Sequence, residues 1–513
     1  GRSPLGDGGP AGPLRAQMAF DGLDADTVFN TPCIGYNFAD LVSLPCHAVH
    51  SVGEVDLITR FSRNTVLGSP IVSAPLDTVS EGRMAITCAL LGGISVIHCN
   101  GSADQQAKEV SVVKHYEHGF IMDPNVLPPD KTVEDVDRLR QLTGCSTVLV
   151  TDSGSMGSKL MGIVTSRDID LVEDRKTRIT DIMTPKDELK FGMEPISMSQ
   201  AQEKLRASRK GKLPIINEGG ELVALVSRGD LKKSRAHPLA AQDANKQLLV
   251  AAAVKPGDGD RVTKLVEAGA DCIVLDAAQG DSLAQLDFLK RVKHKYPNLD
   301  VVCGNVVAPR QAKPLLDAGA DGLRVGMGCS SLFAAREACA IGRPQGSAVY
   351  HVARFASEQH GVPVCADGGI LSSGSMSMAL TLGASTVMCG SLLAGTAESP
   401  GEAFYRDGLR LKMYRGSGAL DLMPAEGASL PGAALGKPAV VPQASVLRSA
   451  APGCALVEKG SAGELLGCML DGVKRDLRRL GVGSVEQLHE DLYKGNTRFH
   501  VRTSGARGPA AFR

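Results

Sequence analysis

The chain has 513 residues, of which 43% are hydrophobic and 22% are charged. Lys plus Arg and Asp plus Glu both number 56, so the zero net charge argues against a general attraction to nucleic acid or to an anionic membrane. The 13 Cys lie scattered without C-x-x-C pairs, and no apolar run approaches the ~18 residues of a membrane span. We expect a soluble, reduced, cytoplasmic protein of about two to four domains that binds small molecules.

The chain opens with GRSPLGDGGPAGPLRAQ, which is rich in Gly and Pro. This stretch lacks the apolar region of a signal peptide, and its composition is typical of a segment that cannot bury a core. We therefore expect a disordered tail over residues 1–28.

Eight short apolar runs then end in Gly, Ser, Asp or Asn and precede helix-like segments. Unbroken apolar strands that alternate with amphipathic helices such as RVTKLVEAGA are typical of parallel strands buried on both faces. Eight of them favour an α/β fold of the (β/α)8 TIM barrel type, with polar residues of the strand carboxyl ends at the catalytic mouth. The alternative is that the Gly and Ser residues at the strand ends only form turns. This alternative explains any one strand end better than it explains all eight. The runs begin at Pro70, Gly92, Leu248, Asp271, Leu299, Asp321, Val362 and Ala384.

A long insertion separates the second run from the third, because a simple connection needs far fewer residues. Within it LMGIVTSRDI (160–169) is echoed by LVALVSRGDL (222–231), which indicates an internal repeat. Each copy places a hydroxyl three residues before an acid, Thr165 before Asp168 and Ser227 before Asp230. The same spacing is that of a helix capping box, so spacing alone supports a ligand-binding role and a capping role equally.

The repeat resembles a tandem pair of cystathionine-β-synthase (CBS) domains, a Bateman module. Elsewhere SAPLDTVSEGRMAI, GGISVIH, KQLLVAAAV, DGLRVGMG, GRPQG, ADGGI, GSLLAGTAESPGE and KMYRGSGALD occur in the order found in IMP dehydrogenases of the eukaryotic type. From about Phe29 to Thr503 the chain therefore resembles the IMP dehydrogenase/GMP reductase family. The resemblance implies a tail (1–28), a first barrel part (29–121), CBS domains (122–178 and 179–236), a second barrel part (237–503) with a flap (about 423–460), and a C-terminal tail (504–513).

The resemblance also implies a reaction and partners. IMP dehydrogenases oxidise IMP to XMP with NAD in guanine nucleotide synthesis, through a Cys thiolate that attacks the purine C2, hydride transfer, and hydrolysis of the adduct. Their CBS domains bind purine nucleotides such as ATP and GTP, here through Thr165, Asp168, Ser227 and Asp230. They also control assembly, so we expect a homotetramer or octamer, or an assembly mixed with an active relative.

The IMP site of the family is retained at most positions. By resemblance the 5′-phosphate is held by Ser331, Gly369, Gly390, Ser391 and Tyr414, and Asp367 accepts hydrogen bonds from the ribose hydroxyls. Glycine-rich loops and hydroxyls suit a phosphate, and a carboxylate at a strand end suits a diol. The remaining IMP-site residues are Gly418 and Gln443; the latter matches a glutamine at the purine edge or is a solvated loop amide.

The catalytic residues of the family are replaced. The loop GMGCSSLFAA places Phe333 at the position of the nucleophilic Cys and Ala335 at that of the Thr. Neither side chain carries a lone pair for covalent catalysis. Cys329 lies four residues upstream, a displacement of up to roughly 13 Å in an extended chain, so it is a poor substitute unless the loop refolds. The flap has no Arg-Tyr pair, and Glu426 is its one candidate base near neutral pH.

The cofactor residues are only partly retained. By resemblance Asp276, Asn305 and Arg324 contact NAD, but the family's Asp-Ser-Ser-Gln-Gly motif is DAAQG here and loses two hydroxyls. Ala74 and Cys99 replace a family Ser and His. A K⁺ ion would use the backbone carbonyls of Gly326, Gly328 and Phe333, but RTSGARGPAAFR lacks the Glu that completes the family's cation site.

Three functions of different class follow. The favoured one is a pseudoenzyme that binds purine nucleotides and assembles with itself or with an active relative. The second is a working IMP dehydrogenase that uses Cys329 or a rearranged flap, and the third is a scaffold in which neither site binds a ligand. GMP reductase activity is disfavoured because its enzymes rely on the same replaced Cys and Thr.

Overall fold

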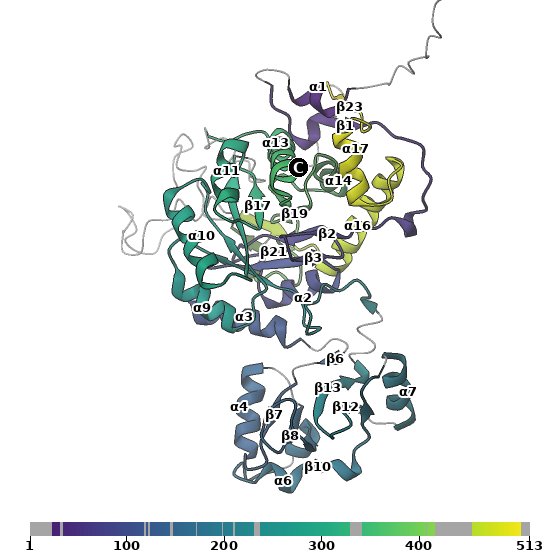
Figure 1. The fold of residues 1–513 in the computed structure, drawn as a ribbon, viewed down its shortest axis with the longest axis vertical. Coiled ribbons are helices and arrows are strands. Elements are labelled where there is room, and N and C mark those ends of the chain that lie inside the picture. Colours follow the sequence, from purple (N-terminus) through teal and green to yellow (C-terminus); the bar gives the residue numbers. More distant parts are fainter. Residues whose placement is uncertain are drawn as a thin grey trace, which may run out of the picture.

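Eight parallel strands close into a barrel in the computed structural model of the chain (Figure 1). They coincide with the eight apolar runs, so the predicted TIM barrel is confirmed. The structure describes residues 23–30, 34–116, 120–121, 124–143, 147–170, 172–196, 198–208, 211–229, 236–328, 341–406, 408–415 and 454–503. In barrel order the strands are β14 (Ala251–Val254), β15 (Cys272–Leu275), β16 (Asp300–Val306), β17 (Gly322–Val325), β18 (Val364–Asp367), β19 (Thr386–Cys389), β4 (Ile71–Ser73) and β5 (Ile94–Ile97).

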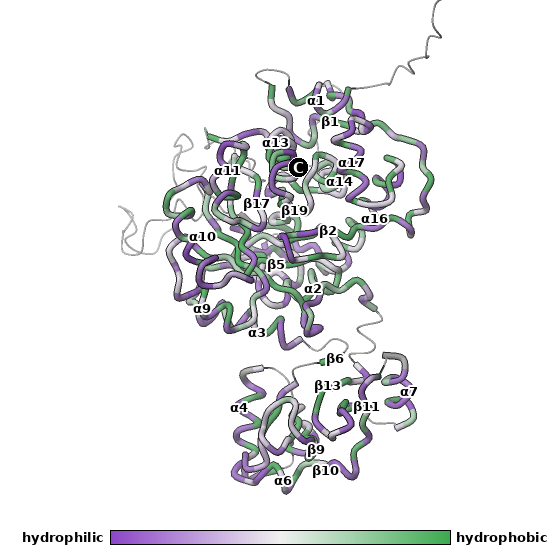
Figure 2. The backbone as a smooth tube through the Cα atoms, viewed as in Figure 1, coloured by the Kyte–Doolittle hydropathy of each residue, from purple (hydrophilic) through white to green (hydrophobic). Residues whose placement is uncertain are grey.

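The strands are buried almost throughout, and Figure 2 shows hydrophobic residues along them. Helices cover the outside of the barrel. For example, α10 begins at the N-cap Ser282, whose hydroxyl accepts a hydrogen bond from the Gln285 amide, and ends in a basic turn that suits the negative end of a helix. The helices of the barrel are α2 (Gly82–Leu90), α3 (Ala103–Lys114), α9 (Gly259–Glu267), α10 (Leu283–Lys295), α11 (Pro309–Asp317), α13 (Gln345–His360), α14 (Ser373–Thr381), α16 (Ala462–Arg479) and α17 (Val485–Tyr493).

Aspartates fix the amino-terminal end of the barrel. Asp271 precedes β15 and accepts a hydrogen bond from the Val250 amide at 2.8 Å. Asp321 precedes β17 and accepts one from the Val301 amide at 2.9 Å. Asp300, which begins β16 and is 3% exposed, accepts a hydrogen bond from the Asn64 amide at 2.9 Å. Because these carboxylates are committed to neighbouring backbone, they stabilise the barrel and leave chemistry to the opposite, carboxyl-terminal mouth.

The N-terminal residues of the described chain pack against the barrel. Helix α1 (Ala25–Phe29) begins within the expected tail and ends at Phe29, the first residue expected in the barrel, which is 5% exposed and stacks on Tyr350 of α13 at 4.4 Å. The structure differs here from the tail expected over residues 1–28, because Ala25, Val28 and Phe29 of α1 are buried against the barrel domain.

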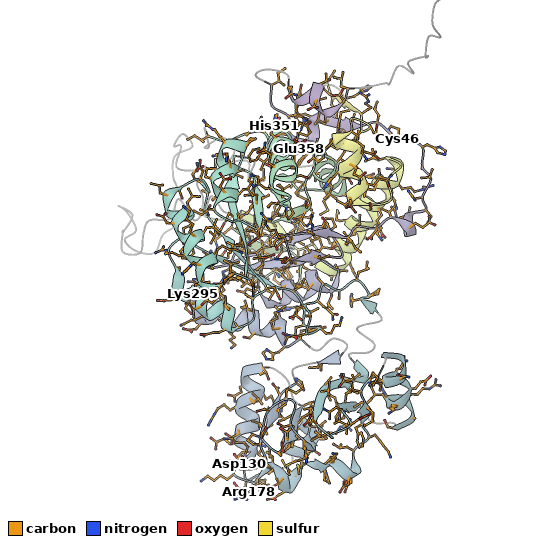
Figure 3. The ribbon with its side chains drawn as sticks, viewed as in Figure 1. Cys46, Asp130, Arg178, Lys295, His351 and Glu358 are labelled. Atoms are coloured by element: carbon orange, nitrogen blue, oxygen red, sulfur yellow. The ribbon has the colours of Figure 1, made fainter. Side chains whose placement is uncertain are left out.

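The insertion lies apart from this region. Figure 3 shows His351 and Glu358 of α13 far from Asp130 and Arg178 in the insertion.

Short elements complete the barrel domain. Strand β22 falls inside the expected flap and extends the hairpin β20–β21 into a three-stranded sheet. Strand β1 pairs antiparallel with β23, which joins the two ends of the described chain. The elements are η1 (Phe38–Asp40), β1 (Leu41–Ser43), η2 (Val52–Glu54), β2 (Thr59–Arg60), β3 (Val66–Leu67), β20 (Ala403–Arg406), β21 (Leu409–Tyr414), β22 (Cys454–Val457) and β23 (Phe499–Val501).

The insertion folds as two four-stranded sheets, β10-β9-β8-β7 and β11-β12-β13-β6. In each sheet one outer pair is parallel and the other two pairs are antiparallel, as an internal repeat would give. Leu149, Ile163, Ile216 and Leu225 belong to a core shared by both sheets, so the sheets form one packed unit. That the repeats are CBS domains stays a prediction.

The two sheets exchange short strands across the expected boundaries of the insertion. Strand β10 lies beyond residue 178 but pairs with β9, and β6 lies before residue 122 but pairs with β13. The elements are β6 (Phe120–Ile121), β7 (Val126–Leu127), α4 (Val133–Thr143), β8 (Val148–Thr151), β9 (Leu160–Val164), α5 (Ser166–Ile169), α6 (Ile179–Ile182), β10 (Thr184–Pro185), η3 (Lys186–Glu188), β11 (Gly192–Met193), α7 (Met198–Ser208), β12 (Lys212–Ile216) and β13 (Leu222–Ser227).

The insertion leaves the barrel after α3 and returns before β14, so it joins the amino-terminal end of the barrel, away from the mouth. Among the described residues, no helix combines the length and apolar character needed to cross a bilayer. Eight cysteines of the described segments are free thiols, six of them buried.

Candidate functional site

Three of the expected ligand residues form one ion-pair cluster at the barrel mouth. Arg324 of β17 donates from Nη1 to Asp276 Oδ1 at 2.5 Å and from Nε to Asp367 Oδ2 at 2.9 Å. Asp276 directly follows β15 and Asp367 ends β18, so the carboxyl ends of parallel strands bring these side chains to one edge. The cluster is thus built by the barrel itself.

Electrostatics keep Arg324 in its charged form. Burial alone would lower the pKa of Arg324, which is 3% exposed, but the carboxylates of Asp367 and Asp276 outweigh it and raise the pKa. The Asp276 and Asp367 side chains are 27% and 19% exposed, so part of each carboxylate remains accessible to a ligand. A fixed cation with two partly accessible carboxylates suits a ligand that donates hydrogen bonds, such as a diol.

Asn305 completes the cluster from β16. Its Nδ2 group donates to Asp367 Oδ2 at 2.9 Å and to the Gly326 carbonyl at 2.7 Å. Its Oδ1 atom is buried and has no hydrogen-bond partner among the described residues. A buried amide oxygen without a partner is costly, which makes it a candidate acceptor for a donor on a bound ligand.

The backbone beside the cluster permits little substitution. Gly326 has φ of 153°, and a Cβ there would collide with the Asp367 carbonyl oxygen. Gln345, at the start of α13, donates to that carbonyl at 2.9 Å and to the Val325 carbonyl at 2.8 Å. The sequence analysis missed Gln345 as a supporting residue, although it stands in the GRPQG motif. It ties the ends of β17 and β18 together.

The expected phosphate residues Gly390 and Tyr414 lie side by side. A Cβ on Gly390 would be 3.4 Å from the Tyr414 hydroxyl and 3.6 Å from Cβ of Ala74. Gly390 and Ser391 directly follow β19, while Gly369, with φ of 76°, follows the neighbouring strand β18. Strand β21 and the loops after β18, β19 and β4 therefore meet at this part of the mouth.

The remaining mouth residues fall outside the described segments. They are the catalytic-loop positions Cys329, Phe333 and Ala335 and the expected IMP contacts Ser331, Gly418 and Gln443. Their roles stay predictions from the sequence.

The described residues do not fit NAD as the family resemblance requires. Asp276 is in place, but Ala277 and Ala278 offer only methyl groups where two hydroxyls were expected. Burial, and secondly the charge of Asp276, raises the pKa of the Cys99 thiol, so this replacement for a family His supplies neither a charge nor a ready base.

The expected K⁺ ligands are likewise incomplete. The Gly326 carbonyl already accepts the hydrogen bond from Asn305, and Phe333 lies outside the described residues. Gly328 has φ of 77°, which suits a tight loop but adds only one carbonyl. Two of the three expected carbonyls, those of Gly326 and Gly328, lie within the described residues, and binding of K⁺ stays a prediction from the sequence.

In the insertion, the first repeat shows the capping arrangement. The amide and the hydroxyl of Thr165 donate to Asp168 Oδ2 at 2.7 and 2.8 Å, at the start of α5. Ser227, 5% exposed, ends β13, and Asp230 lies outside the described residues. The capping alternative is therefore realised for Thr165 and Asp168, while nucleotide binding by the four residues stays a prediction.

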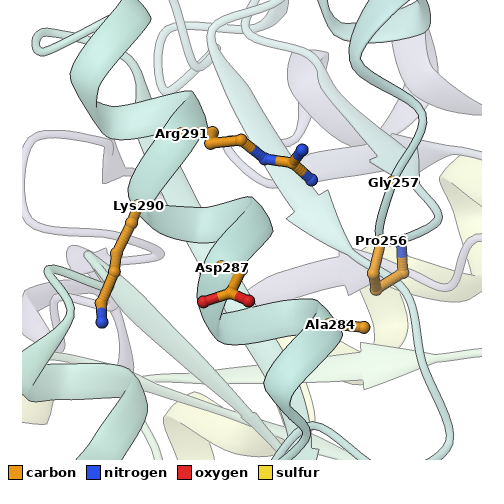
Figure 4. A pocket seen from close by; sticks show the side chains of 6 residues that line it. All are labelled: Pro256, Gly257, Ala284, Asp287, Lys290 and Arg291. Carbon is orange, nitrogen blue, oxygen red and sulfur yellow. The ribbon is translucent and has the colours of Figure 1, made fainter.

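A cavity of about 550 Å³ opens on the outer side of the barrel (Figure 4). It lies between the loop after β14 and α10, next to the segment that leads from Asp276 into that helix. Figure 4 shows Arg291 of α10 extending toward the loop that carries Pro256 and Gly257, whereas Lys290 points away from that loop. The lining residues are Pro256, Gly257, Ala284, Asp287, Lys290 and Arg291.

Comparison with known proteins points to one family. The model of the IMP dehydrogenase / GMP reductase domain matches residues 35–508. The chain is 46% identical over 534 residues to inosine-5′-monophosphate dehydrogenase of Toxoplasma gondii, covering 95% of this chain and 96% of the relative. It is 44% identical over 490 residues to that of Schizosaccharomyces pombe, covering 95% and 93%.

Solved structures agree with the sequence matches. A cysteine-to-alanine variant of GMP reductase from Trypanosoma brucei, in complex with guanosine 5′-monophosphate, superposes with a TM-score of 0.76 at 32% identity, covering 94% of this chain and 98% of that one. GMP reductase of the same organism in complex with guanosine 5′-triphosphate gives a TM-score of 0.70 at 30% identity, covering 93% and 100%.

Proposed function

The chain belongs to the IMP dehydrogenase / GMP reductase family, and from that premise we propose that it binds a purine nucleoside 5′-monophosphate at the barrel mouth. The observation that carries the proposal is the cluster in which Arg324 holds the accessible carboxylates of Asp276 and Asp367 beside Asn305. The guanosine 5′-monophosphate named with one trypanosomal structure supports the same ligand class, and the guanosine 5′-triphosphate named with the other supports purine nucleotide binding in general.

Each part of the nucleotide has a proposed partner. Asp367 accepts hydrogen bonds from the ribose hydroxyls, and the bonds from Arg324 and Asn305 to its Oδ2 atom fix the orientation of the carboxylate. Backbone amides and hydroxyls then hold the phosphate without a paired cation. The proposed phosphate ligands are Ser331, Gly369, Gly390, Ser391 and Tyr414, and the proposed purine contacts are Gly418 and Gln443.

We further propose that the chain does not perform the family reaction, which makes it a pseudoenzyme. Phe333 and Ala335 stand where the reaction needs a thiolate and a hydroxyl, and neither can bond to a purine carbon. Loss of a covalent nucleophile removes several orders of magnitude in rate. The poor fit of the described residues to NAD supports the same proposal.

The insertion and the assembly complete the proposal. We propose that the two repeats are CBS domains that bind ATP or GTP, and that the chain forms a homotetramer or octamer, or joins an active relative. Their shared core supports a single regulatory unit. A cytoplasmic location fits free, buried thiols and is proposed on that ground.

Calorimetric titration with IMP and GMP tests binding, and NADH absorbance with IMP, NAD and K⁺ tests catalysis. The expected result is saturable binding without NADH. NADH formation that is abolished by Cys329→Ala would establish the working enzyme instead. Binding of neither nucleotide, with no thermal shift from ATP or GTP, would favour the scaffold.

A further inference from the structure

A second group of contacts at the mouth joins the loop after β4 to the end of β21. Arg415 forms a two-pronged ion pair with Asp77, Nη2 to Oδ2 at 2.9 Å and Nε to Oδ1 at 3.2 Å. The Arg415 amide donates to the Thr78 hydroxyl at 3.0 Å, and that hydroxyl lies 3.4 Å from the Arg415 carbonyl oxygen. We call Asp77, Thr78 and Arg415 the latch.

Hydrogen bonds among three buried serines fix the loop that carries Asp77 and Thr78. The Ser73 hydroxyl, at the end of β4, lies 2.6 Å from the hydroxyls of both Ser80 and Ser95. Ser80 also bonds to the carbonyl at the start of the loop at 2.6 Å. All three serines are fully buried, and a buried network whose members are paired fixes one backbone path. The loop is therefore a rigid anchor for Arg415.

The residue before Arg415 is Tyr414, a proposed phosphate ligand. It is 4% exposed, and its hydroxyl would contact a Cβ on Gly390 at 3.4 Å. We propose that the latch is a positioning device that sets this hydroxyl against the Gly390 loop for the nucleotide phosphate, an inference that rests on the proposed nucleotide binding. Asp77, Thr78 and Arg415 are positioning residues and do not touch the ligand.

The chemistry of the phosphate contacts makes such positioning necessary. Hydroxyl and amide donors bind a phosphate through short, directional hydrogen bonds that weaken steeply when the geometry is lost. Two nitrogens of Arg415 are paired with Asp77, so we assign its guanidinium to positioning and not to the phosphate. The ion pair is charge-balanced, so its effect on the ligand acts through the position of Tyr414.

Calorimetric titration of variants with IMP and with inosine, which lacks the phosphate, tests the latch. Asp77→Asn and Arg415→Lys, which lose the two-pronged geometry, should weaken IMP binding about tenfold, as for one hydrogen bond to a charged group. Inosine affinity should stay unchanged. Thr78→Ser keeps the hydroxyl and should bind like the wild type. Lys313→Gln, which breaks an exposed pair with Asp317 on α11, is the matched control.

Hydrogen exchange supplies a readout that needs no ligand. The Arg415 amide, which donates to Thr78, should exchange faster in Asp77→Asn than in the Lys313→Gln control. Wild-type IMP affinity in Arg415→Lys would overturn the latch and leave nucleotide binding standing. Equal losses for IMP and inosine would also overturn it, since the effect would not be on the phosphate. A wild-type chain that binds neither ligand would overturn both proposals.

Discussion

Lys114→Met should lower the free energy of unfolding of the barrel by about 2–3 kcal/mol. Lys114 is 4% exposed, and its ammonium group lies 2.7 Å from Asp271 and 2.9 Å from Asp243. Breaking a buried ion pair by removing one partner costs about 3–5 kcal/mol. The cost here is smaller because the carboxylates are 15% and 19% exposed, and each keeps one backbone donor, the amides of Val250 and Gln247. Methionine fills most of the space of the lysine stem, so no large cavity forms.

The stability lost in Lys114→Met should be smaller at lower pH. Burial, the largest cause, raises the pKa of Asp271 above its ordinary value of 3.8, and Lys114 holds it down. Without Lys114 the pKa rises further, so the folded state takes up a proton at a higher pH than the unfolded chain does. A folded-state pKa above the unfolded value adds stability as the pH falls through it. The variant should therefore differ less from the wild type at about pH 5 than at about pH 8.

Urea denaturation followed by circular dichroism at both pH values measures these differences. Lys264→Met is the matched control, because Lys264 of α9 pairs with Asp104 of α3 at 2.6 Å, with side chains that are 43% and 78% exposed. An exposed pair is worth little, so the control should change stability by less than about 0.5 kcal/mol. If Lys114→Met unfolds with the same free energy as the control, the reasoning from burial is refuted.

Three further predictions concern the mouth, its backbone and the C-terminal helices. In calorimetry, Tyr414→Phe should weaken IMP binding about tenfold and spare inosine, because one phosphate hydrogen bond is lost; equal IMP affinity would exclude the tyrosine as a ligand. In thermal melting, Gly326→Ala should cost about 3 kcal/mol or more, whereas Gly157→Ala, at φ of 74° with open space around it, should cost about 1 kcal/mol; similar costs would contradict the steric argument. Burial lowers the pKa of His489 below its ordinary value of 6.5, and Nε2 lies 3.1 Å from two backbone carbonyls. Stability should therefore fall as the pH drops below about 6.5, where the unfolded chain takes up the proton, and His489→Gln should remove part of this fall in pH-dependent urea melts; an unchanged profile would argue against it.

The barrel strands could be predicted because burial on both faces leaves an unbroken apolar run in the sequence. Strand ends were less predictable. The run from Leu248 yields β14 only from Ala251, because the Leu249 amide donates to the Ala241 carbonyl instead of joining the barrel ladder. The exchanged strands β6 and β10 have two residues each, too few to carry a periodic pattern.

The residues of the site could be predicted from the sequence, but the contacts between them could not. Asp276, Arg324, Asp367 and Asn305 were expected as separate ligand contacts, but the sequence did not indicate that Arg324 binds both carboxylates. These contacts join residues 48 and 43 positions apart and exist only because β15, β17 and β18 end at the same edge of the barrel. The pair of Asp77 and Arg415, 338 positions apart, was missed for the same reason.

Native mass spectrometry of the full chain with IMP, NAD and K⁺ tests the central claim most directly. We expect the native protein to carry IMP, and denaturation of the same sample to restore the unmodified mass of the chain. A nucleotide that remains attached after denaturation would show a covalent bond to the protein, and the claim of binding without bond formation would then be wrong.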